Sequence, residues 1–349
     1  MDVICEEVPG NQGDIGLITL NRQQALNALN LEMFQAIHLS LKKWESMKTI
    51  KAIVIRASEG RAFSAGGDIR YIYERKLKND SHLDDFFSFE YAVNQYIFHY
   101  PKPYIALLNG ITMGGGAGIS IHGSHRIATE HVTFAMPETT IGFYPDIGAS
   151  YFLSRLPHQI GLYLGLTGSS ITYSDCYALH LVDAVIDPAS QEELLQTLIV
   201  TPLPDYTAVT NAIHPWRITV SGSTLLNFKE DIEKCFSKNS VEEIIQTLRS
   251  LNNDWSHQII KTLETKSPTS LKVAFQEINN AKKLNFDDCM KMENKIMQQM
   301  IRGHDFFEGV RALIIDKDKN PKWRPKTLED VTQKEIQSYF MPFLLPNLS

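Results

Sequence analysis

The sequence predicts a layered α/β fold, because short apolar runs alternate with longer amphipathic stretches over its first half. The runs are brief and rich in β-branched residues, as buried strands are: IGLITL, KAIVIRA, PYIALL and VTFAMP, at 15–20, 51–57, 103–108 and 132–137. Between the first two, Met33, Ile37, Leu41 and Trp44 are spaced to share one face of a helix. This alternation predicts sheet strands covered by helices.

The pattern changes near residue 190. Prolines and weak periodicity between 187 and 223 predict an irregular connection there. Beyond it the sequence favours helices: Ser240 followed by Glu243 is typical of a capping box, and Pro268 suits a helix's first turn. We therefore predict a catalytic core over 1–190, a connection over 191–223 and a mainly helical region over 224–349.

Composition excludes several classes of function. The chain has 349 residues, 43% of them hydrophobic, and a net charge of −6 with scattered basic residues. It can bury a large core, and nucleic acid or an anionic membrane is not expected as a partner. Four separated cysteines predict neither a disulfide framework nor a zinc knuckle. The acidic N-terminus predicts a soluble intracellular chain, or one whose leader has been removed. Oligomeric state is not readable.

The segment GITMGGGAG, residues 110–118, follows an apolar run and precedes a predicted helix. Its spacing fits neither a P-loop, which needs Lys and a hydroxyl residue after the second glycine, nor a dinucleotide fingerprint. A serine-hydrolase elbow fails too, so Ser120 is expected to be a packed helix residue. His122 and His125 are spaced to share a helix face, but we expect ordinary polar residues and no metal site.

Two interpretations of these glycines remain: exposed main-chain N–H groups that contact a ligand, or close packing of helix on sheet. A second glycine turn, RAFSAGGDI at 61–69, also follows a strand and offers the N–H of Gly67 beside a capping Asp68. Two such turns can supply one N–H group each to an oxyanion.

The pairing of AFSAGGDI with NGITMGGGAG resembles the crotonase (enoyl-CoA hydratase/isomerase) superfamily, as does LNRQQALNALN at 20–30. Its thioester-hydrolysing members are the most similar, through FAMPETTIGFYPDIGASYFLSRL, SPTSLK and RGHDFFEGVRALIIDKDKNPKW. The resemblance implies a crotonase-type spiral core of repeated β-β-α units with a mainly helical C-terminal region. It assigns an oxyanion hole to the N–H groups of Gly67 and Gly115.

Glu138 and Asp146 each directly follow a proline, which stiffens the backbone beneath them. The surrounding residues are mostly apolar, and carboxyl groups in such a setting have raised pKa values. An arbitrary acidic pair would be placed at the surface, but the resemblance implies that both are catalytic and bind substrate. It also aligns Glu90 with a substrate-contacting acid, against the alternative of an ion pair with a nearby arginine.

The implied reaction is hydrolysis of 3-hydroxyisobutyryl-CoA, an intermediate of valine breakdown, to 3-hydroxyisobutyrate and CoA. Glu138 would attack the carbonyl or act as a general base, with Asp146 orienting water or the substrate hydroxyl. CoA is substrate and product, so no retained cofactor is expected. Arg22 is a candidate for its phosphates.

Two alternatives stay open. Hydratases of the superfamily use two glutamates, the first at the position where this chain has Gly118 and the second matching Glu138. The absence of the first glutamate disfavours a hydratase or isomerase. A non-catalytic CoA-binding protein is disfavoured by the two carboxylates. The resemblance implies a cytoplasmic location for a bacterial chain, and the mitochondrial matrix for a processed eukaryotic one.

Overall fold

The computed structural model describes residues 1–78 and 83–342. Its contacts divide the chain into two compact units, each assembled from segments far apart in the sequence. Unit 1 consists of 1–68, 92–135 and 170–227, and unit 2 of 69–91, 136–169 and 228–349. The division therefore differs from the boundary expected near residue 190, because the chain enters unit 2 twice before its C-terminal helices begin.

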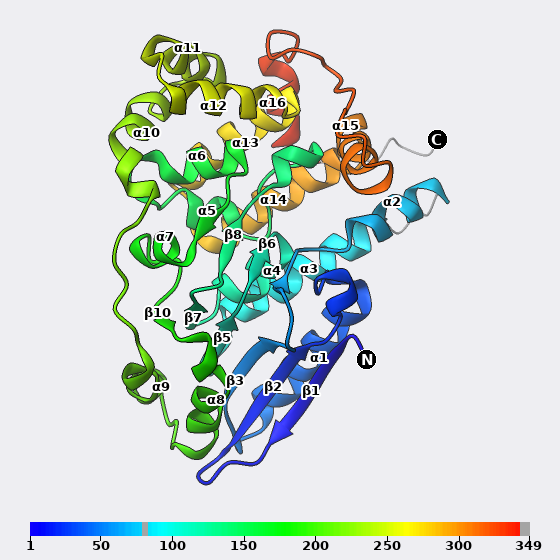
Figure 1. The fold of residues 1–349 in the computed structure, drawn as a ribbon. Coiled ribbons are helices and arrows are strands. Elements are labelled where there is room, and N and C mark those ends of the chain that lie inside the picture. Colours follow the sequence, from blue (N-terminus) through cyan, green and yellow to red (C-terminus); the bar gives the residue numbers. More distant parts are fainter. Residues whose placement is uncertain (79–82, 343–349) are drawn as a thin grey trace. The chain divides into compact units, whose positions relative to one another are not determined.

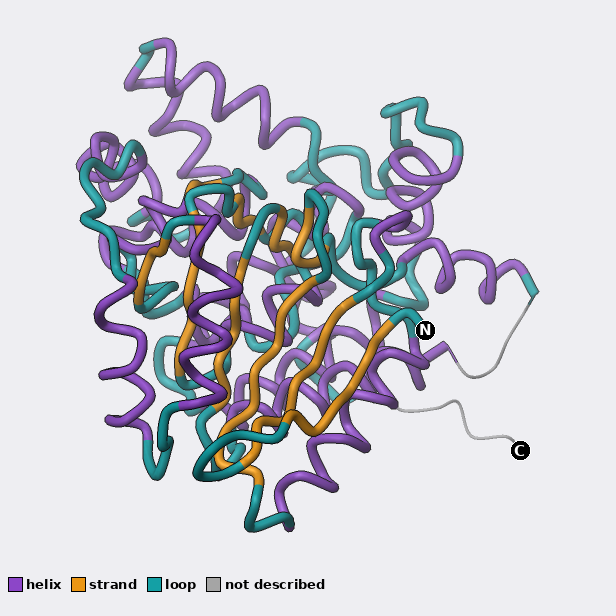
Figure 2. The backbone as a smooth tube through the Cα atoms, turned by 60° about the horizontal axis from the view of Figure 1, so that its bottom comes forward, coloured by secondary structure: helices purple, strands orange, loops and turns teal. Residues whose placement is uncertain are grey.

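A six-stranded sheet forms the centre of unit 1 (Figures 1 and 2), in the order β1-β2-β3-β5-β7-β10. Its strands are β1 Val3–Val8, β2 Asp14–Leu20, β3 Ile50–Ala57, β5 Tyr104–Leu108, β7 His125–Thr129 and β10 Ala184–Ile186. Only β1 and β2 pair antiparallel, and every other neighbouring pair in this sheet is parallel. The apolar runs predicted as strands at 15–20, 51–57 and 103–108 are confirmed as β2, β3 and β5.

A smaller sheet in unit 1 has the order β4-β6-β8-β9. Its strands are β4 Ala62–Ser64, β6 Ile111–Met113, β8 Thr133–Ala135 and β9 Ile171–Thr172. The chain visits the two sheets alternately, passing from β3 to β4, from β5 to β6 and from β7 to β8. Helices follow β4 and β6, which gives the expected β-β-α repeat. The predicted strand at 132–137 is shorter than expected, because a 3₁₀ turn begins at Glu138.

Helices cover both faces of the large sheet. The helices of unit 1 are α1 Leu31–Ser46, α4 Gly115–Ile121, α7 Tyr173–Ala178, α8 Gln191–Val200 and α9 Tyr206–Ile213, with the end of α3 Leu83–Phe98. On one face, alternate strand residues such as Leu17 and Val54 form a core with Leu194 and Leu198 of α8. On the other, a Cβ on Gly16 would lie 2.6 Å from the Trp44 ring, so glycine makes room for α1.

The stretch 191–223, expected to be an irregular connection, contains the helices α8 and α9. Asp205 caps α9 by accepting a hydrogen bond from the N–H of Ala208 at 2.8 Å. The prolines that suggested irregularity fall between these helices or within a single turn, where proline is tolerated. The buried residues Leu194, Leu195, Leu198 and Ile199 of α8 have helical spacing, which the neighbouring prolines obscured in the sequence.

Unit 2 is helical. Its helices are α2 Ile69–Leu77, the start of α3, α5 Ala149–Leu153, α6 Ile160–Thr167, α10 Lys229–Phe236, α11 Val241–Leu251, α12 Asp254–Glu264, α13 Pro268–Ala281, α14 Phe286–Met300, α15 His304–Val310 and α16 Gln333–Tyr339. Every residue of α6 is buried, and a Cβ on Gly165 would meet Ile278 of α13 at 2.5 Å. Glycine therefore allows these two helices to pack closely.

Of the two helix starts predicted in unit 2, the one at Pro268 is confirmed, and the one at Ser240 is confirmed in part. Pro268 lies in the first turn of α13, where Ser267 caps the helix. Ser240 caps α11 by accepting from the N–H of Glu243, but the Glu243 carboxylate accepts from the N–H of Asn239 instead of Ser240. The reciprocal half of the capping box is therefore shifted by one residue.

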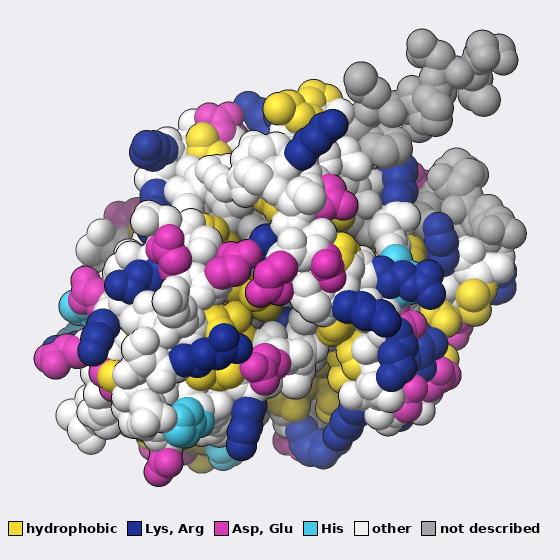
Figure 3. Space-filling model, turned by 90° about the horizontal axis from the view of Figure 1, so that it is seen from above, with side chains coloured by type: hydrophobic (Ala, Val, Ile, Leu, Met, Phe, Trp, Pro, Cys, Tyr) yellow, Lys and Arg dark blue, Asp and Glu magenta, His cyan; other side chains and the backbone are white. Residues whose placement is uncertain are grey.

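The described part of the chain contains no helix that is both long and apolar enough to span a membrane. The face shown in Figure 3 carries basic and acidic side chains interspersed with one another. Such mixing on this face leaves little net electrostatic field of one sign.

Candidate active site

In unit 1, the first glycine turn lies against residues 26–29. The N–H of Ala65 donates to the Leu26 carbonyl at 2.9 Å. On either side of Gly67, the Gly66 carbonyl accepts from the N–H of Leu29, and the N–H of Asp68 donates to the Leu29 carbonyl, both at 2.8 Å. Within the described residues of this unit, we find no acceptor for the N–H of Gly67. The neighbouring amides are thus engaged while that of Gly67 is available to a ligand.

The motif LNRQQALNALN holds this turn in place. Asn27, buried and with a left-handed φ of +53°, donates to the Ala62 carbonyl at 3.0 Å, and its own carbonyl accepts from Ser64 Oγ at 2.8 Å. Arg22 lies 2.8 Å from Asp68 and 3.2 Å from Asp2, so two carboxylates already balance its charge. In this conformation Arg22 supports the turn, and it is poorly placed for the CoA phosphates that the sequence suggested.

The second glycine turn contacts the first. A Cβ on Gly66, whose φ is +111°, would lie 3.3 Å from the Met113 carbonyl and 3.5 Å from the N of Gly115. Gly115 opens α4, where an N–H group has no acceptor within the helix. A Cβ on Gly116 would lie only 2.6 Å from the Ser64 carbonyl. The run therefore combines both interpretations: Gly116 permits close packing, and Gly115 presents an N–H group.

The two histidines near α4 do not share a helix face, contrary to the sequence interpretation. The helix ends at Ile121, and His125 lies in β7, where its Nε2 is 3.0 Å from Thr210 Oγ1. Burial lowers the pKa of His125. The described residues contain no group of three potential ligands arranged around a metal.

Glu138 lies in unit 2, at the first residue of the 3₁₀ turn Glu138–Ile141 that Pro137 begins. Its side chain is buried, and Oε2 has no hydrogen-bond partner among the described residues. Burial raises the pKa of Glu138 well above its usual value, and the charge of Asp146 raises it further. A buried carboxyl with a free oxygen is suited to proton transfer or to attack on a substrate.

Asp146 lies in the loop between the 3₁₀ turn Glu138–Ile141 and α5. Its Oδ2 is 2.9 Å from the Tyr91 hydroxyl, and burial raises its pKa to about 7. The loop is anchored by Glu293 of α14, whose carboxylate accepts from the N–H of Gly148 at 2.6 Å and from the N–H and hydroxyl of Ser150 at 3.0 and 2.5 Å.

Glu90, on α3, is buried in the same unit, and its interactions are with acids. Burial raises the pKa of Glu90 well above its usual value, and the charges of Asp146 and then Glu138 add to the rise. No arginine ion pair of Glu90 is found within the part of unit 2 that the structure describes, which disfavours the structural alternative. Unit 2 therefore brings together all three predicted carboxyls.

Four further ionisable groups of this cluster escaped sequence analysis: Tyr91, Tyr144, Glu277 and Glu293. The side chains are buried, and neither carboxylate oxygen of Glu277 has a partner among the described residues. A local signal existed for Glu293, because it lies among apolar residues such as Met292 and Ile296, which are buried on α14. An acid at a core position of a helix is unusual and indicates a specific partner.

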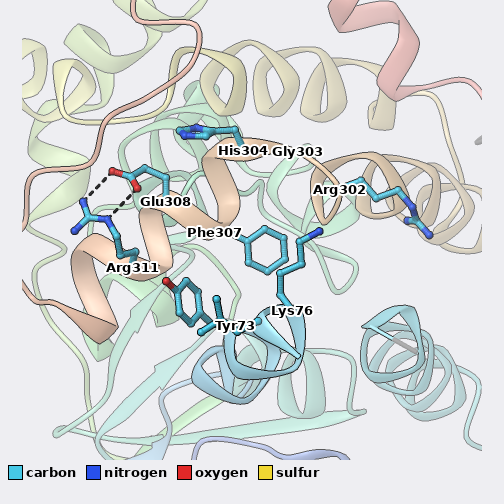
Figure 4. Close-up of a pocket in the computed structure, with 9 residues that line it drawn as sticks. Tyr73, Lys76, Arg302, Gly303, His304, Phe307, Glu308 and Arg311 are labelled. Atoms are coloured by element: carbon cyan, nitrogen blue, oxygen red, sulfur yellow. Dashed lines mark hydrogen bonds and ion pairs between the residues drawn. The ribbon is translucent and has the colours of Figure 1, made fainter. Parts of the chain in front are cut away.

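Unit 2 also contains a pocket of about 470 Å³ between α2 and the start of α15, a size typical of ligand sites. In Figure 4 the Lys76 ammonium lies above the Phe307 ring, 5.1 Å from its centre, with Tyr73 nearby. Arg311 is held by Glu308, and Arg302 by Asp84. Lys76 is left as a pocket cation with no carboxylate partner found among the described residues of the unit.

Comparison with known proteins confirms the expected fold class and superfamily. The family described as Enoyl-CoA hydratase/isomerase matches residues 15–340. The chain is 39% identical to the mitochondrial 3-hydroxyisobutyryl-CoA hydrolase of Homo sapiens, over 97% of this chain and 89% of that one. It is 41% identical to the enzyme of the same name from Rattus norvegicus, over 94% and 87%.

Solved structures of similar fold carry other names. A carnitinyl-CoA dehydratase from Mycobacterium thermoresistibile is 32% identical, with a TM-score of 0.90 over 98% of this chain and 97% of that one. An enoyl-CoA hydratase from Rhodobacter sphaeroides is also 32% identical, with a TM-score of 0.89 over 98% of both chains. The fold is thus shared by proteins named for different reactions of CoA esters.

Proposed function

Because the chain belongs to the enoyl-CoA hydratase/isomerase family, we propose that it hydrolyses the thioester of 3-hydroxyisobutyryl-CoA, giving 3-hydroxyisobutyrate and CoA. The buried carboxyls Glu138 and Asp146 carry this proposal, since hydrolysis needs a group that attacks the carbonyl or activates water. Relatives about 40% identical are named for this reaction. Those relatives are named as mitochondrial. We infer that this chain would act in valine breakdown, in the mitochondrial matrix if it is a processed eukaryotic chain and in the cytoplasm if it is bacterial.

The N–H groups of Gly67 and Gly115 would receive the negative charge that develops on the thioester oxygen. Main-chain donors held by a rigid fold stabilise such a charge without reorganising as it forms, which typically contributes about 3–4 kcal/mol per donor. The leaving group requires little assistance, because a thiol of pKa about 8.5 departs readily as thiolate. The mechanism requires these donors and Glu138 to act on one thioester carbonyl.

Two routes are open to Glu138. In one, its carboxylate attacks the carbonyl, the C–S bond breaks, and water then hydrolyses the mixed anhydride. In the other, it takes a proton from the water that attacks directly. Turnover in the presence of hydroxylamine separates them: a hydroxamate on the Glu138 peptide marks the anhydride, whereas an unmodified peptide after many turnovers favours the general base.

Asp146 and Glu90 would contact the acyl part of the substrate. A 3-hydroxyl group can donate to a carboxylate or accept from a carboxylic acid, and the raised pKa values of both side chains make either form accessible. An acyl chain without the hydroxyl would leave a buried carboxyl oxygen without this partner, at a cost of about 1–3 kcal/mol. We therefore expect a preference for 3-hydroxyacyl esters, with 3-hydroxypropionyl-CoA as a second substrate.

The phosphorylated end of CoA requires cations. Lys76 is a stronger candidate than Arg22, Arg302 or Arg311, because carboxylates already pair with these three arginines. Binding one phosphate at a partly exposed lysine contributes modestly. The pocket beneath Lys76 would therefore affect affinity for the ester more than the rate of the chemical step.

The main alternative is hydration of an enoyl-CoA, because two structures of this fold are named for such reactions. The chain has Gly118 where the hydratase pattern has the first of its two glutamates, and this glycine is buried inside α4. Addition of water to a double bond would thus have one carboxylate fewer. A non-catalytic CoA-binding protein would not need the buried carboxyls of unit 2.

A panel of short acyl-CoA esters tests the proposal. Release of free thiol from 3-hydroxyisobutyryl-CoA, faster than from isobutyryl-CoA, is the expected result. Loss of enoyl absorbance from an unsaturated ester with its thioester intact would instead identify a hydratase. Binding of every ester with no change in any of them would identify a binding protein.

A further inference from the structure

A chain of hydrogen bonds links Asp146 to the backbone of α14. Asp146 Oδ2 lies 2.9 Å from the Tyr91 hydroxyl, which lies 2.8 Å from the Tyr144 hydroxyl, which in turn lies 2.5 Å from the Glu293 carbonyl oxygen. The tyrosines are buried, so water does not readily complete their hydrogen bonding. Three oxygen-to-oxygen contacts therefore need three protons.

The donor in each hydrogen bond follows from the group at the end of the chain, the Glu293 carbonyl. A backbone carbonyl has no proton to give, so Tyr144 must donate to Glu293. Tyr144 has a single proton, so Tyr91 must donate the one between the two hydroxyls. The proton of Tyr91 is then also used. An ionised Asp146 would therefore lie 2.9 Å from a lone pair of the Tyr91 hydroxyl oxygen, with no proton between the two oxygens. Only a proton on Asp146 completes the chain.

We propose that Asp146 is held as a neutral carboxylic acid that donates its proton to Tyr91, and that Tyr91 and Tyr144 are positioning residues that assign the ionised role to Glu138. This inference rests on the proposed function for its catalytic meaning, but the proton assignment does not. With Asp146 neutral, its second oxygen still accepts a hydrogen bond from water or from a substrate hydroxyl.

The electrostatics of the cluster agree with one neutral member. Within the described part of unit 2, the charge of Asp146 raises the pKa values of Glu90 and Tyr91 on α3, Glu138 in its 3₁₀ turn, Tyr144 in the loop, Glu277 on α13 and Glu293 on α14. None is basic. Charge on Asp146 is the second cause, after burial, of the raised pKa of Glu138. Neutralising Asp146 therefore lowers the pH at which Glu138 ionises.

Infrared difference spectroscopy tests where the proton is, without an activity assay. The spectrum of the wild-type chain minus that of Asp146→Asn, in mildly acidic to neutral buffer, should contain a carboxylic-acid C=O band. The Asn side chain can still donate to Tyr91, so this variant preserves the hydrogen bond. A carboxylate band in place of the acid band would overturn the proposal, whatever the chain hydrolyses.

Tyr144→Phe tests the direction of the chain. Without the Tyr144 hydroxyl, the proton of Tyr91 is free to turn towards Asp146 and stabilise its ionised form. The alkaline limb of the kcat/KM profile should then move to lower pH by about one to two units, the equivalent of one hydrogen bond to a charge. A purely structural role would lower kcat and leave this limb in place, which would contradict the proposal.

Tyr104→Phe is the matched control. Tyr104 is also buried and donates to a backbone carbonyl, that of Ile119 at 3.0 Å, but it lies in unit 1, outside the hydrogen-bond chain. The Tyr104→Phe variant should leave both limbs of the kcat/KM profile unchanged. If no ester releases thiol, the proposed function fails, while the infrared result still decides the proton assignment.

Discussion

The two units provide their functional groups in opposite ways. Unit 1 offers main-chain N–H groups from two glycine turns, and its side chains there, Asn27 and Ser64, serve to hold the backbone. Unit 2 offers side-chain carboxyls, and its backbone serves to hold them, as in the loop amides bound by Glu293. A donor that must not move is built from the backbone, whereas groups that exchange protons must be side chains, because only these titrate.

This contrast predicts that activity depends on single oxygen atoms of the carboxyl groups in unit 2. Glu138→Gln keeps the size of the side chain but removes the base or nucleophile, so kcat should fall by about 10³-fold or more. Calorimetric binding of the CoA ester should persist. Glu230→Gln, at an exposed site on α10, is the control and should keep full activity. Turnover by Glu138→Gln at the wild-type rate would show that another group does the chemistry.

Unit 1 should instead be sensitive to displacement of its backbone. The added methyl group of Gly116→Ala would meet the Ser64 carbonyl at 2.6 Å, and backbone cannot swing aside as a side chain can. We expect kcat to fall about 10²-fold, as for a catalytic group displaced by about 1 Å, with stability reduced by about 1–3 kcal/mol.

Gly60→Ala is the control for this displacement. There the new methyl group would meet the end of the flexible Gln23 side chain, which can move away. Its kcat and unfolding midpoint should remain close to those of the wild type. Equal losses in the two variants would indicate that α4 is not held tightly against β4.

The carboxyl cluster makes the stability of the protein depend on pH. Burial and the charge of Glu293 raise the pKa of Glu277 in the folded state, so the folded chain retains a proton that the unfolded chain releases above its usual pKa of about 4.3. The stabilisation is therefore complete at acidic pH and is lost as the pH rises. Glu277→Gln cannot ionise, and its Tm should exceed that of the wild type by about 2–4 °C at pH ~8.

At acidic pH the same two proteins should have similar Tm values, because Glu277 is then neutral in both folded and unfolded states. Glu329→Gln, at an exposed glutamate, should follow the wild type at every pH. A constant difference between Glu277→Gln and the wild type across the pH range would contradict the ionisation argument and would point to packing.

The smallest effect is expected at the pocket of unit 2. Lys76→Gln removes the cation above Phe307 and should raise KM for the CoA ester about three- to fivefold, with little change in kcat, since a partly exposed ion pair contributes about 1 kcal/mol or less. Lys78→Gln makes the same change of charge at an exposed position outside this pocket and should leave KM unchanged. Equal KM values in the two variants would show that Lys76 does not bind a phosphate of the ester.

Local patterns in the sequence identified much of this arrangement. The strands β2, β3 and β5 and helix α1 follow from apolar spacing. The acids at 138 and 146 have prolines and apolar neighbours, but their catalytic role was implied only by the family resemblance. Strands as short as β4 and β6 have too few residues to show a period, and α8 and α9 were concealed by neighbouring prolines. The division into units was also hidden, because each unit draws on three separate segments.

The sequence by itself determined where the glycines let the backbone turn and which acids lie in apolar surroundings, because both depend on neighbours within a few residues. Only the tertiary structure decided that Tyr91 reaches Asp146 across 55 positions, and that Glu293 binds the loop amides of Gly148 across 145. Such partners meet because α3 and α14 pack against that loop. Packing between distant segments, unlike local conformation, leaves no regular spacing in the chain.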